Sequence, residues 1–415
     1  MLKQEKAKDK LMPLIVVTYV VSKRGSIMSK KVMSVLEEMT GGKSYRAHKY
    51  GLDNNERPSI DYTEDNIIWQ ETAETKRNRN YVPLWDESKK VLTSGTNILS
   101  FFLDGSRRVF KVDDMGFVLP GGRNVIFPVI AGQIGIGCTR RENRALKQEK
   151  FYQEFVLSMP DIANADGKAG YFPALAQKLN SCQSLKNANI EFSTILEYKT
   201  AKNYEAKYED KGTALVQERM SIREREMVAE LVREGKLDQD NYLIKDGSLE
   251  YRPTKQDRAD EKKYQQFRNN YNFVLGVSKN FNPEVCKDIN GKSNPGYVAD
   301  LPLYHRTPVA CFKNTDLFGD VKFAVWYIRI RDTTKTRTAF DGIVKVEKML
   351  ITHEENEYGI DSELVDLLSA SIINERNPVC YGSDLRWANH LYPVYLTETY
   401  VKSRYLSADS FLHLF

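Results

Sequence analysis

The sequence predicts a mixed α/β fold built on one sheet, and the order of its elements carries this prediction. Three strand patterns between residues 97 and 137 come before any long helix. The longest helical pattern, from Thr213 to Glu234, follows them. Helices then alternate irregularly with strand patterns at 241–245, 273–279, 321–330 and 343–350. A doubly wound parallel sheet would require regular alternation, so this order favours a mixed sheet.

Composition limits the class of protein. The chain has 415 residues, of which 41% are hydrophobic and 28% charged, so it can bury a core. The 61 Lys and Arg against 56 Asp and Glu leave a net charge of +5, which excludes a histone-like polycation but allows a local basic groove. Five scattered cysteines without a C-x-x-C pair, and five histidines, argue against a structural zinc site and favour the cytoplasm.

Residues 1–92 are predicted to form an N-terminal extension or arm, and residues 93–415 the main domain. The apolar run from Leu11 to Val21 is about half of the ~20 residues that span a bilayer, so we expect a buried strand and no membrane segment. A helix is expected from Ser29 to Met39, ended by the Gly41-Gly42 pair.

The first strands of the main domain are predicted as an antiparallel meander. The apolar strand at 97–103 runs into Asp104-Gly105-Ser106, a typical turn sequence, and 107–112 has the pattern of a returning strand. A third strand covers 125–137. Its glycines weaken it locally or allow another backbone to approach closely.

A helical insertion is predicted at 142–212, with helices at 144–157 and 171–181. The long helix that follows lacks Gly and Pro and stops at Gly235. The strand at 241–245 then runs into a second Asp-Gly-Ser sequence at 246–248. Further helices are expected at 257–270, at 361–374 and from about Leu396.

Two Gly-Lys-Ser triplets, at 42–44 and 291–293, suggest phosphate-binding loops. A Walker A loop needs a glycine five residues before the Gly-Lys pair, and Glu37 and Cys286 occupy those positions. We therefore do not expect the chain to hydrolyse ATP itself.

Two aspartates are the main candidates for chemistry. Asp104 and Asp246 each follow an apolar strand and precede Gly-Ser. Asp-Gly is a common turn sequence, so either copy alone is compatible with a plain turn. Two copies at the ends of strands predicted to be central favour a function, because a buried carboxylate is costly unless it is hydrogen-bonded or binds a cation.

The long helix adds a third candidate carboxylate. Glu226 and Glu230 lie four residues apart on one face beside the apolar stripe, whereas Glu224 falls on a different face. One of the two would reach over the strand ends, although a solvated face paired with Arg223 and Arg225 fits the pattern equally well. Three carboxylates without His or Cys suit Mg²⁺ or Mn²⁺, ions that activate water for phosphodiester hydrolysis.

The elements follow one another as strand-Asp, hairpin, third strand, helix-Glu, strand-Asp and C-terminal helix. This order resembles the layout of the ribonuclease H-like nuclease fold. Within that group the sequence resembles the NurA family of DNA-end-processing nucleases. The likeness extends over roughly residues 97–405 and is carried by FFLDGSRRVFKV (101–112), the REREMVAEL helix, YLIKDGSLEY (242–251), VLGVSKN (274–280), AVWYIRIRD (324–332), IVKVEKML (343–350) and HLYPVYLTETY (390–400).

The resemblance implies roles for individual residues. Asp104 matches the family's first metal-binding aspartate and Asp246 its second-strand aspartate. Glu226 best matches the helix glutamate, since an apolar pair and a small residue follow it, and Glu230 is the fallback. Together they would hold Mn²⁺ or Mg²⁺. Lys279 falls where the family carries a strand-end lysine, which would contact a phosphate, although an ordinary surface lysine fits as well.

One position departs from the family. After a Tyr-Pro-x-x-Leu stretch the family places Ala-His on the last helix, and here Tyr400 occupies the expected histidine position. The fourth ligand is therefore open between Tyr400 and Glu398. His390 is a further substitute, although its place before the helix is more typical of a surface or capping residue.

The resemblance also implies partners. Members of the family work as homodimers on a hexameric HerA-type ATPase that moves DNA, which implies an exo/endonuclease for DNA end processing in repair or for anti-phage defence. A catalytically inactive scaffold that binds or regulates a translocase is the alternative, and an Argonaute-like binding module is a third reading. Basic candidates for the DNA path, each also compatible with a solvated face, are Arg107, Arg108, Arg140, Arg141 and 76–79.

Overall fold

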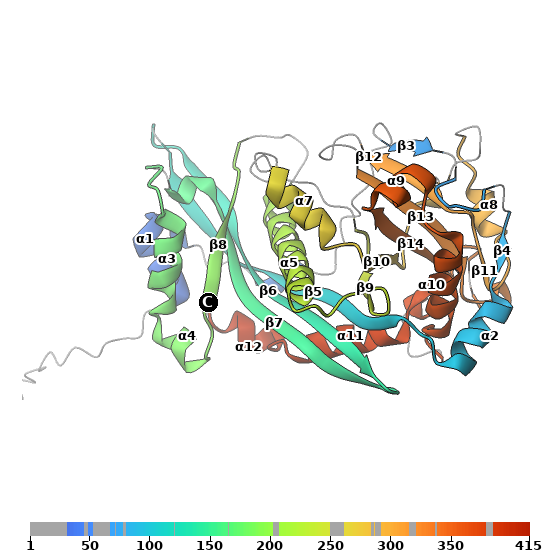
Figure 1. The fold of residues 1–415 in the computed structure, drawn as a ribbon. Coiled ribbons are helices and arrows are strands. Elements are labelled where there is room, and N and C mark those ends of the chain that lie inside the picture. Colours follow the sequence, from blue (N-terminus) through green and yellow to red (C-terminus); the bar gives the residue numbers. More distant parts are fainter. Residues whose placement is uncertain are drawn as a thin grey trace, which may run out of the picture.

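The structure is a computed structural model of the 415-residue chain. Figure 1 shows long strands crossing the molecule, with helices packed along them. The structure describes residues 31–44, 49–52, 67–70, 72–77, 80–119, 121–164, 166–201, 207–249, 261–283, 286, 292–314, 321–336, 338–378 and 385–415. The predicted strand at 11–21 lies outside these residues.

The centre of the sheet consists of five strands. β5 (Leu99–Val118), β6 (Asn124–Glu142) and β7 (Ala145–Pro160) form an antiparallel meander. β9 (Tyr242–Asp246) pairs parallel with the other side of β5, and β10 (Val274–Ser278) pairs parallel with β9. The spatial order β7-β6-β5-β9-β10, with only β6 reversed, is that of the ribonuclease H-like fold. The predicted fold class, a mixed α/β sheet, is confirmed.

Further strands widen the sheet on both sides. Beyond β10 lie β14 (Ile343–Leu350), β13 (Val321–Arg329), β12 (Ala310–Asn314) and β3 (Ile67–Gln70). Beyond β7 lies β8 (Phe192–Tyr198), which is parallel to it. Short strands complete the sheet, and these are β1 (Lys43–Ser44), β2 (Tyr50–Gly51), β4 (Val82–Pro83) and β11 (His305–Arg306). Described parts of the predicted N-terminal arm thus belong to the same sheet.

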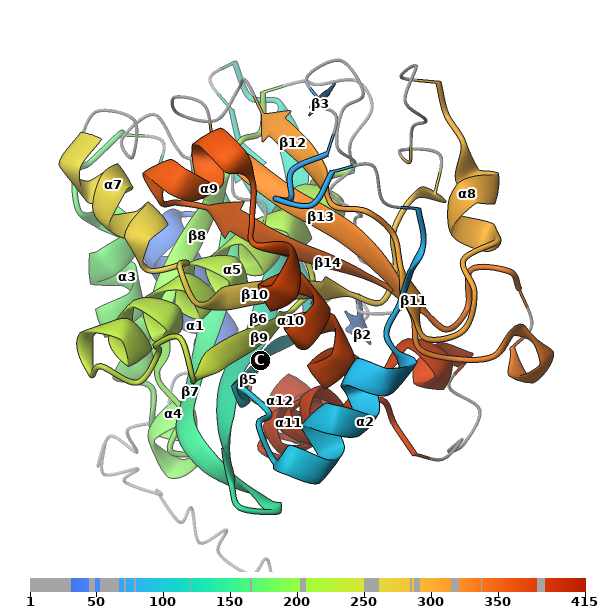
Figure 2. The ribbon, with the colours of Figure 1, turned by 45° about the vertical axis from the view of Figure 1, so that its right-hand side comes forward.

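The helices pack on both faces and at the ends of this sheet. Their bounds are α1 (Val32–Thr40), α2 (Trp85–Ser94), α3 (Tyr171–Asn180), α4 (Gln183–Asn187), α5 (Tyr208–Arg233), α7 (Glu261–Asn269), α8 (Pro295–Ala299), α9 (His353–Tyr358), α10 (Ser362–Asn374), α11 (Tyr392–Ser403) and α12 (Ala408–Leu412). Figure 2 shows α2 beside α10, where the Ser88 hydroxyl donates to Asn374 Oδ1 over 2.7 Å. None of the helices within the described ranges combines the length and apolar character that a bilayer crossing requires.

The predicted hairpin at 97–112, with its returning strand at 107–112, and the predicted helix at 144–157 are both wrong. Residues 104–106 do not form a turn, because β5 continues through them while Asp104 pairs with Gly137 and Ser106 with Gly135. Residues 144–157 are not helical but belong to β7, which pairs with β6 along its length. In both cases the ladder with β6 satisfies the backbone and overrides the local turn or helix preference.

The glycines of β6 allow two helices to approach the sheet closely. A Cβ atom on Gly132 would lie 2.7 Å from Val216 of α5, and one on Gly135 would lie 2.7 Å from Val401 of α11. Positions 132 and 135 face opposite sides of a strand, so α5 and α11 cover opposite faces. Figure 1 shows the two helices on either side of the long strands. The predicted close approach at these glycines is confirmed.

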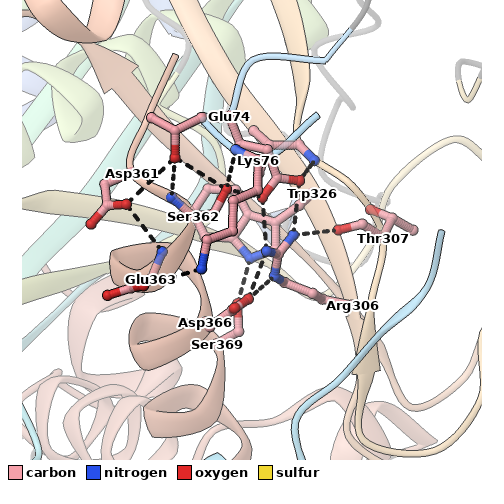
Figure 3. A network of polar contacts seen from close by, with 12 residues as sticks. Glu74, Lys76, Arg306, Thr307, Trp326, Asp361, Ser362, Glu363, Asp366 and Ser369 are labelled. Carbon is pink, nitrogen blue, oxygen red and sulfur yellow. Dashed lines mark hydrogen bonds and ion pairs between the residues drawn. The ribbon is translucent and has the colours of Figure 1, made fainter. Parts of the chain in front are cut away.

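A buried polar network ties residues 72–77 to β11 and α10 (Figure 3). Arg306 of β11 is fully buried, with its Nη2 atom 2.8 Å from Glu74 Oε2 and 2.6 Å from Asp366 Oδ1 of α10. The Ser362 hydroxyl donates to Glu74 Oε2 over 2.8 Å. Removing one partner of a buried pair is strongly destabilising, so this network fixes the segment in place.

Candidate active site

Asp104 and Asp246 meet on one face of the sheet. Leu103 of β5 pairs with Lys245 of β9, so the two aspartates, one residue further along parallel strands, are neighbours. Asp104 also pairs with Gly137, and a Cβ atom on Gly137 would point at Val401 of α11. Because paired residues point to the same face, both aspartates lie beneath α11.

Lysine and glutamate side chains complete this group. Lys279, which directly follows β10, places its Nζ atom 2.8 Å from Asp246 Oδ2 and 3.7 Å from Glu398 Oε2 of α11. The other oxygen of Glu398, Oε1, lies 2.6 Å from Lys402 Nζ. Asp104 is 2% exposed, and its charge also acts on Lys279. We call Asp104, Asp246, Lys279, Glu398 and Lys402 the Lys279 cluster.

Electrostatics keep Lys279 and Glu398 ionised. Burial lowers the pKa of Lys279, but the charges of Asp246, Glu398 and Asp104 outweigh it and hold the pKa above its usual value. Burial raises the pKa of Glu398, but Lys279 and Lys402 outweigh this effect and hold the pKa below its usual value. Lys279 is therefore an ammonium ion among carboxylates.

The buried glutamate of α5 is Glu224. It is 5% exposed, its Oε2 atom lies 2.9 Å from Lys245 Nζ, and its side chain lies against Gly105. Glu226 is half exposed and pairs with Arg223 at 2.5 Å. Glu230 is 46% exposed and pairs with Lys150 at 3.4 Å. The structure brings neither Glu226 nor Glu230 to the two aspartates.

A signal for Glu224 is present in the sequence. Met220, Glu224, Met227 and Leu231 are spaced by four, three and four residues, and all four are buried. Glu224 thus lies within the buried stripe of α5, whereas Glu226 and Glu230 flank it. The family likeness and a position beside the stripe favour Glu226 and Glu230, and neither criterion selects a glutamate inside the stripe.

The sheet separates Glu224 from the Lys279 cluster. Gly105, against which Glu224 packs, points to the α5 face, whereas Asp104 points to the α11 face. Among the residues that the structure describes, no group of three or more His, Cys, Asp or Glu side chains is arranged to hold a metal ion. The acids are arranged around lysines instead.

The chemistry of the donors nevertheless suits a hard cation. Carboxylates from β5, β9 and α11 surround the ammonium group of Lys279, which is itself a cation within an oxygen-donor set. Carboxylate oxygens without His or Cys are the ligands that Mg²⁺ and Mn²⁺ prefer. Asp104, Asp246 and Glu398 are ligands of this chemical type, and the ammonium group of Lys279 interacts with all three.

α11 contributes Glu398 to this group. The Tyr400 hydroxyl hydrogen-bonds Gln148 of β7, and the Tyr400 ring meets Phe151 edge-on, away from Lys279. Thr397, the neighbour of Glu398, shares a 2.7 Å hydrogen bond with Thr139 of β6, which fixes the helix on the sheet. His390 precedes α11 and is buried.

A further acidic residue anchors the chain after Asp246. Glu347 of β14 accepts hydrogen bonds from the Ser248 hydroxyl and the Leu249 N–H, both over 2.8 Å, and pairs with Lys345 at 2.6 Å. Burial raises the pKa of Glu347, but these partners outweigh it and hold the pKa below its usual value. Lys345 and Glu347 interrupt the apolar pattern at 343–350, and this interruption is the sequence signal for the buried pair.

The predicted DNA-binding arginines make contacts within the protein. Arg107 Nε donates to Gln217 Oε1 over 2.7 Å, and Arg141 pairs with Glu375 at 2.5 Å. The other contacts are those of Arg108 with Leu406 O, Arg140 with the Phe101 ring and Lys76 with Glu363. Arg79 lies outside the described residues. Binding of DNA by these residues stays a prediction.

Among known proteins, the chain shows similarity to solved structures. No protein-family model matches the sequence, and no curated protein matches it. Among solved structures, the NurA nuclease from Sulfolobus solfataricus is similar, with 11% sequence identity and a TM-score of 0.39 over 80% of this chain and 89% of that chain. The fold assignment above depends on the strand order and directions of the sheet itself.

Proposed function

We propose that the protein is a metal-dependent nuclease that hydrolyses phosphodiester bonds in DNA. One observation supports this most: aspartates from two adjacent parallel strands and a glutamate from α11 surround a single cationic group. A group of carboxylates on one face of a sheet is what a hard metal ion requires, and hydrolysis of phosphodiesters is the reaction such ions serve best.

Each residue of the site has a role in this proposal. Asp104, Asp246 and Glu398 would hold Mn²⁺ or Mg²⁺, which when bound would activate a water molecule and stabilise the leaving oxygen. Glu398, and not Tyr400, would be the ligand from the last helix. Glu224 replaces Glu226 as the helix glutamate and acts from the α5 face, where it holds Lys245 beside Asp246.

The biological setting is carried over from the family resemblance as part of the proposal. A homodimer would receive DNA from a hexameric HerA-like ATPase in the cytoplasm, in DNA end processing or anti-phage defence. The two failed Walker A patterns agree with a separate ATPase. Lys279 and the basic residues named above would contact the phosphate backbone.

The experiment compares single substitutions on linear DNA with Mn²⁺. Asp104→Asn and Asp246→Asn are expected to lower the rate on the order of 100-fold, which corresponds to about 2.7 kcal/mol of barrier. Glu234→Gln, a partly exposed glutamate at the end of α5, serves as the control. Cleavage by both aspartate variants at the parent rate would exclude this site.

The helix glutamate is tested by a second pair. Glu224→Gln is expected to reduce cleavage and Glu226→Gln to leave it near the parent rate, because only Glu224 contacts the strands that carry the aspartates. Thermal unfolding of each variant separates loss of activity from loss of fold. The reverse ranking would restore Glu226 as the helix glutamate.

A catalytically inactive scaffold is the second candidate. It is favoured by the absence of a metal-holding group among the described side chains and by the lysines that already neutralise the acids. Folded protein that binds DNA but neither binds Mn²⁺ nor cleaves DNA, alone or with a HerA-like ATPase, would support it.

A further inference from the structure

Three buried acids, two of the site and one on the opposite face of the sheet, are each paired with a lysine. Asp246 pairs with Lys279 at 2.8 Å, and Glu398 with Lys402 at 2.6 Å, both on the α11 face. On the α5 face, Glu224 pairs with Lys245 at 2.9 Å. A buried carboxylate needs a counter-charge, and here the chain supplies its own.

Lys279 differs from the other two lysines in its position. Its side chain is 11% exposed, and its ammonium group faces Asp246, Glu398 and Asp104 together. Lys402 is 46% exposed and approaches Glu398 from the outer side. Lys279 therefore occupies the point where the carboxylates of three separate elements meet.

The backbone of Lys279 is held by a side chain from another segment. Its carbonyl oxygen accepts a 2.7 Å hydrogen bond from Asn389 Nδ2, in the segment before α11. The ammonium group ends a flexible four-carbon stem, which can swing without moving the backbone. A rotamer change at Lys279 would therefore leave this backbone contact in place.

We infer that Lys279 is the resident counter-ion of the carboxylate site and competes with a divalent cation for Asp104, Asp246 and Glu398. An ammonium ion and a divalent cation repel each other at contact distance, so they compete for these oxygens. Without metal the lysine keeps the buried acids neutralised, and metal binding requires Lys279 to turn away. This inference rests on the proposed function, because it takes the carboxylates to be the metal site.

Mn²⁺ binding to the full chain tests this competition. Lys279→Met keeps a similar volume and removes the charge, so its affinity for Mn²⁺, measured by electron paramagnetic resonance of free Mn²⁺, is expected to rise about tenfold or more over the parent. Its midpoint of thermal unfolding is expected to fall in EDTA and to recover with Mn²⁺ more strongly than that of the parent.

Two variants serve as controls. Lys402→Met removes a lysine from the same Glu398 but leaves Lys279 in place, so the gain in Mn²⁺ affinity is expected to stay below about threefold. Lys279→Arg keeps the charge and is expected to show no gain. If Lys279→Met does not fold, Lys279→Gln takes its place in the same comparison.

The outcomes separate this inference from the proposed function. Mn²⁺ affinity that is unchanged or weaker in Lys279→Met, or equal gains in Lys279→Met and Lys402→Met, would overturn the competition even if the parent cleaves DNA. Tighter Mn²⁺ binding in Lys279→Met alone would support it even if neither protein cleaves DNA, and in that case only the nuclease proposal fails.

Discussion

The two Asp-Gly-Ser sequences of the chain have the same letters and different structures. Asp104-Gly105-Ser106 lies inside the 20-residue strand β5, whereas Asp246-Gly247-Ser248 ends the five-residue strand β9. Gly247 has a φ of +87°, which favours glycine, and Gly105 is not among the residues with positive φ. Gly105 is needed for another reason, since its missing side chain makes room for Glu224.

Neighbouring strands therefore decide whether a turn sequence forms a turn or continues as a strand. β6 pairs with β5 through and beyond the first copy, so the backbone there has partners and continues straight. After the second copy the chain leaves the sheet, and Glu347 receives the Ser248 hydroxyl and the Leu249 N–H. The chain on both sides of Asp104 is held by the ladder with β6, whereas the chain just after Asp246 is held by a side-chain anchor.

The largest expected effect comes from breaking that anchor. Glu347→Gln leaves the buried ammonium of Lys345 without its carboxylate, so the free energy of unfolding is expected to fall by about 3 kcal/mol. Urea unfolding measures it, with Glu234→Gln as a control that changes the same charge at a partly exposed site. A loss no larger than that of the control would show that the second copy does not depend on Glu347.

Alanine substitutions at Gly105 and Gly247 test why each position requires a glycine. In Gly105→Ala the new Cβ atom would overlap Glu224 Oε1 and lie 2.9 Å from its Cδ atom, which is expected to cost about 2 kcal/mol of stability. In Gly247→Ala the space is open and only the left-handed backbone is strained, at about 1 kcal/mol.

A double-mutant cycle checks this assignment. Glu224→Ala is expected to relieve part of the cost of Gly105→Ala and none of the cost of Gly247→Ala. Additive effects of Gly105→Ala and Glu224→Ala, measured by urea unfolding, would contradict a close contact between the two residues.

The smallest expected effect is a difference in pH dependence. The pKa of Glu347 is lowered in the folded protein, so its stabilising contribution is present above the ordinary pKa of glutamate and is lost as the pH falls through the lowered value. Glu347→Gln is therefore expected to flatten the decline of stability on acidification, whereas Gly247→Ala leaves it unchanged. Parallel declines in the parent and Glu347→Gln would contradict this sign.

Much of the element order could be predicted because local periodicity reports burial. The strand at 343–350 matches β14, and the helix at 361–374 matches α10 within one residue. The helix predicted at 213–234 begins five residues earlier, at Tyr208, and ends at Arg233. The segment at 144–157 failed because its polar sequence has no clear period, and only the ladder with β6 makes it a strand.

The residues of the candidate site could likewise be predicted only in part. Asp104 and Asp246 were selected from the sequence, because each follows an apolar strand, and Glu398 was one of two residues considered for the last helix. The identity of the buried helix glutamate depends on how α5 is rotated against β5, which the resemblance did not decide. The central place of Lys279 depends on three elements meeting, and its contact with Glu398 joins residues more than a hundred positions apart.

The sequence by itself determined the fold class, most of its elements and the acidic character of the site, because these follow from local patterns of apolar and charged residues. Tertiary contacts decide that the first Asp-Gly-Ser continues as a strand, that Glu224 packs against Gly105, and that Lys279 lies among the carboxylates. The physical reason is that pairing of distant strands and packing of helices on them bring together charges whose separation in the chain conceals their proximity.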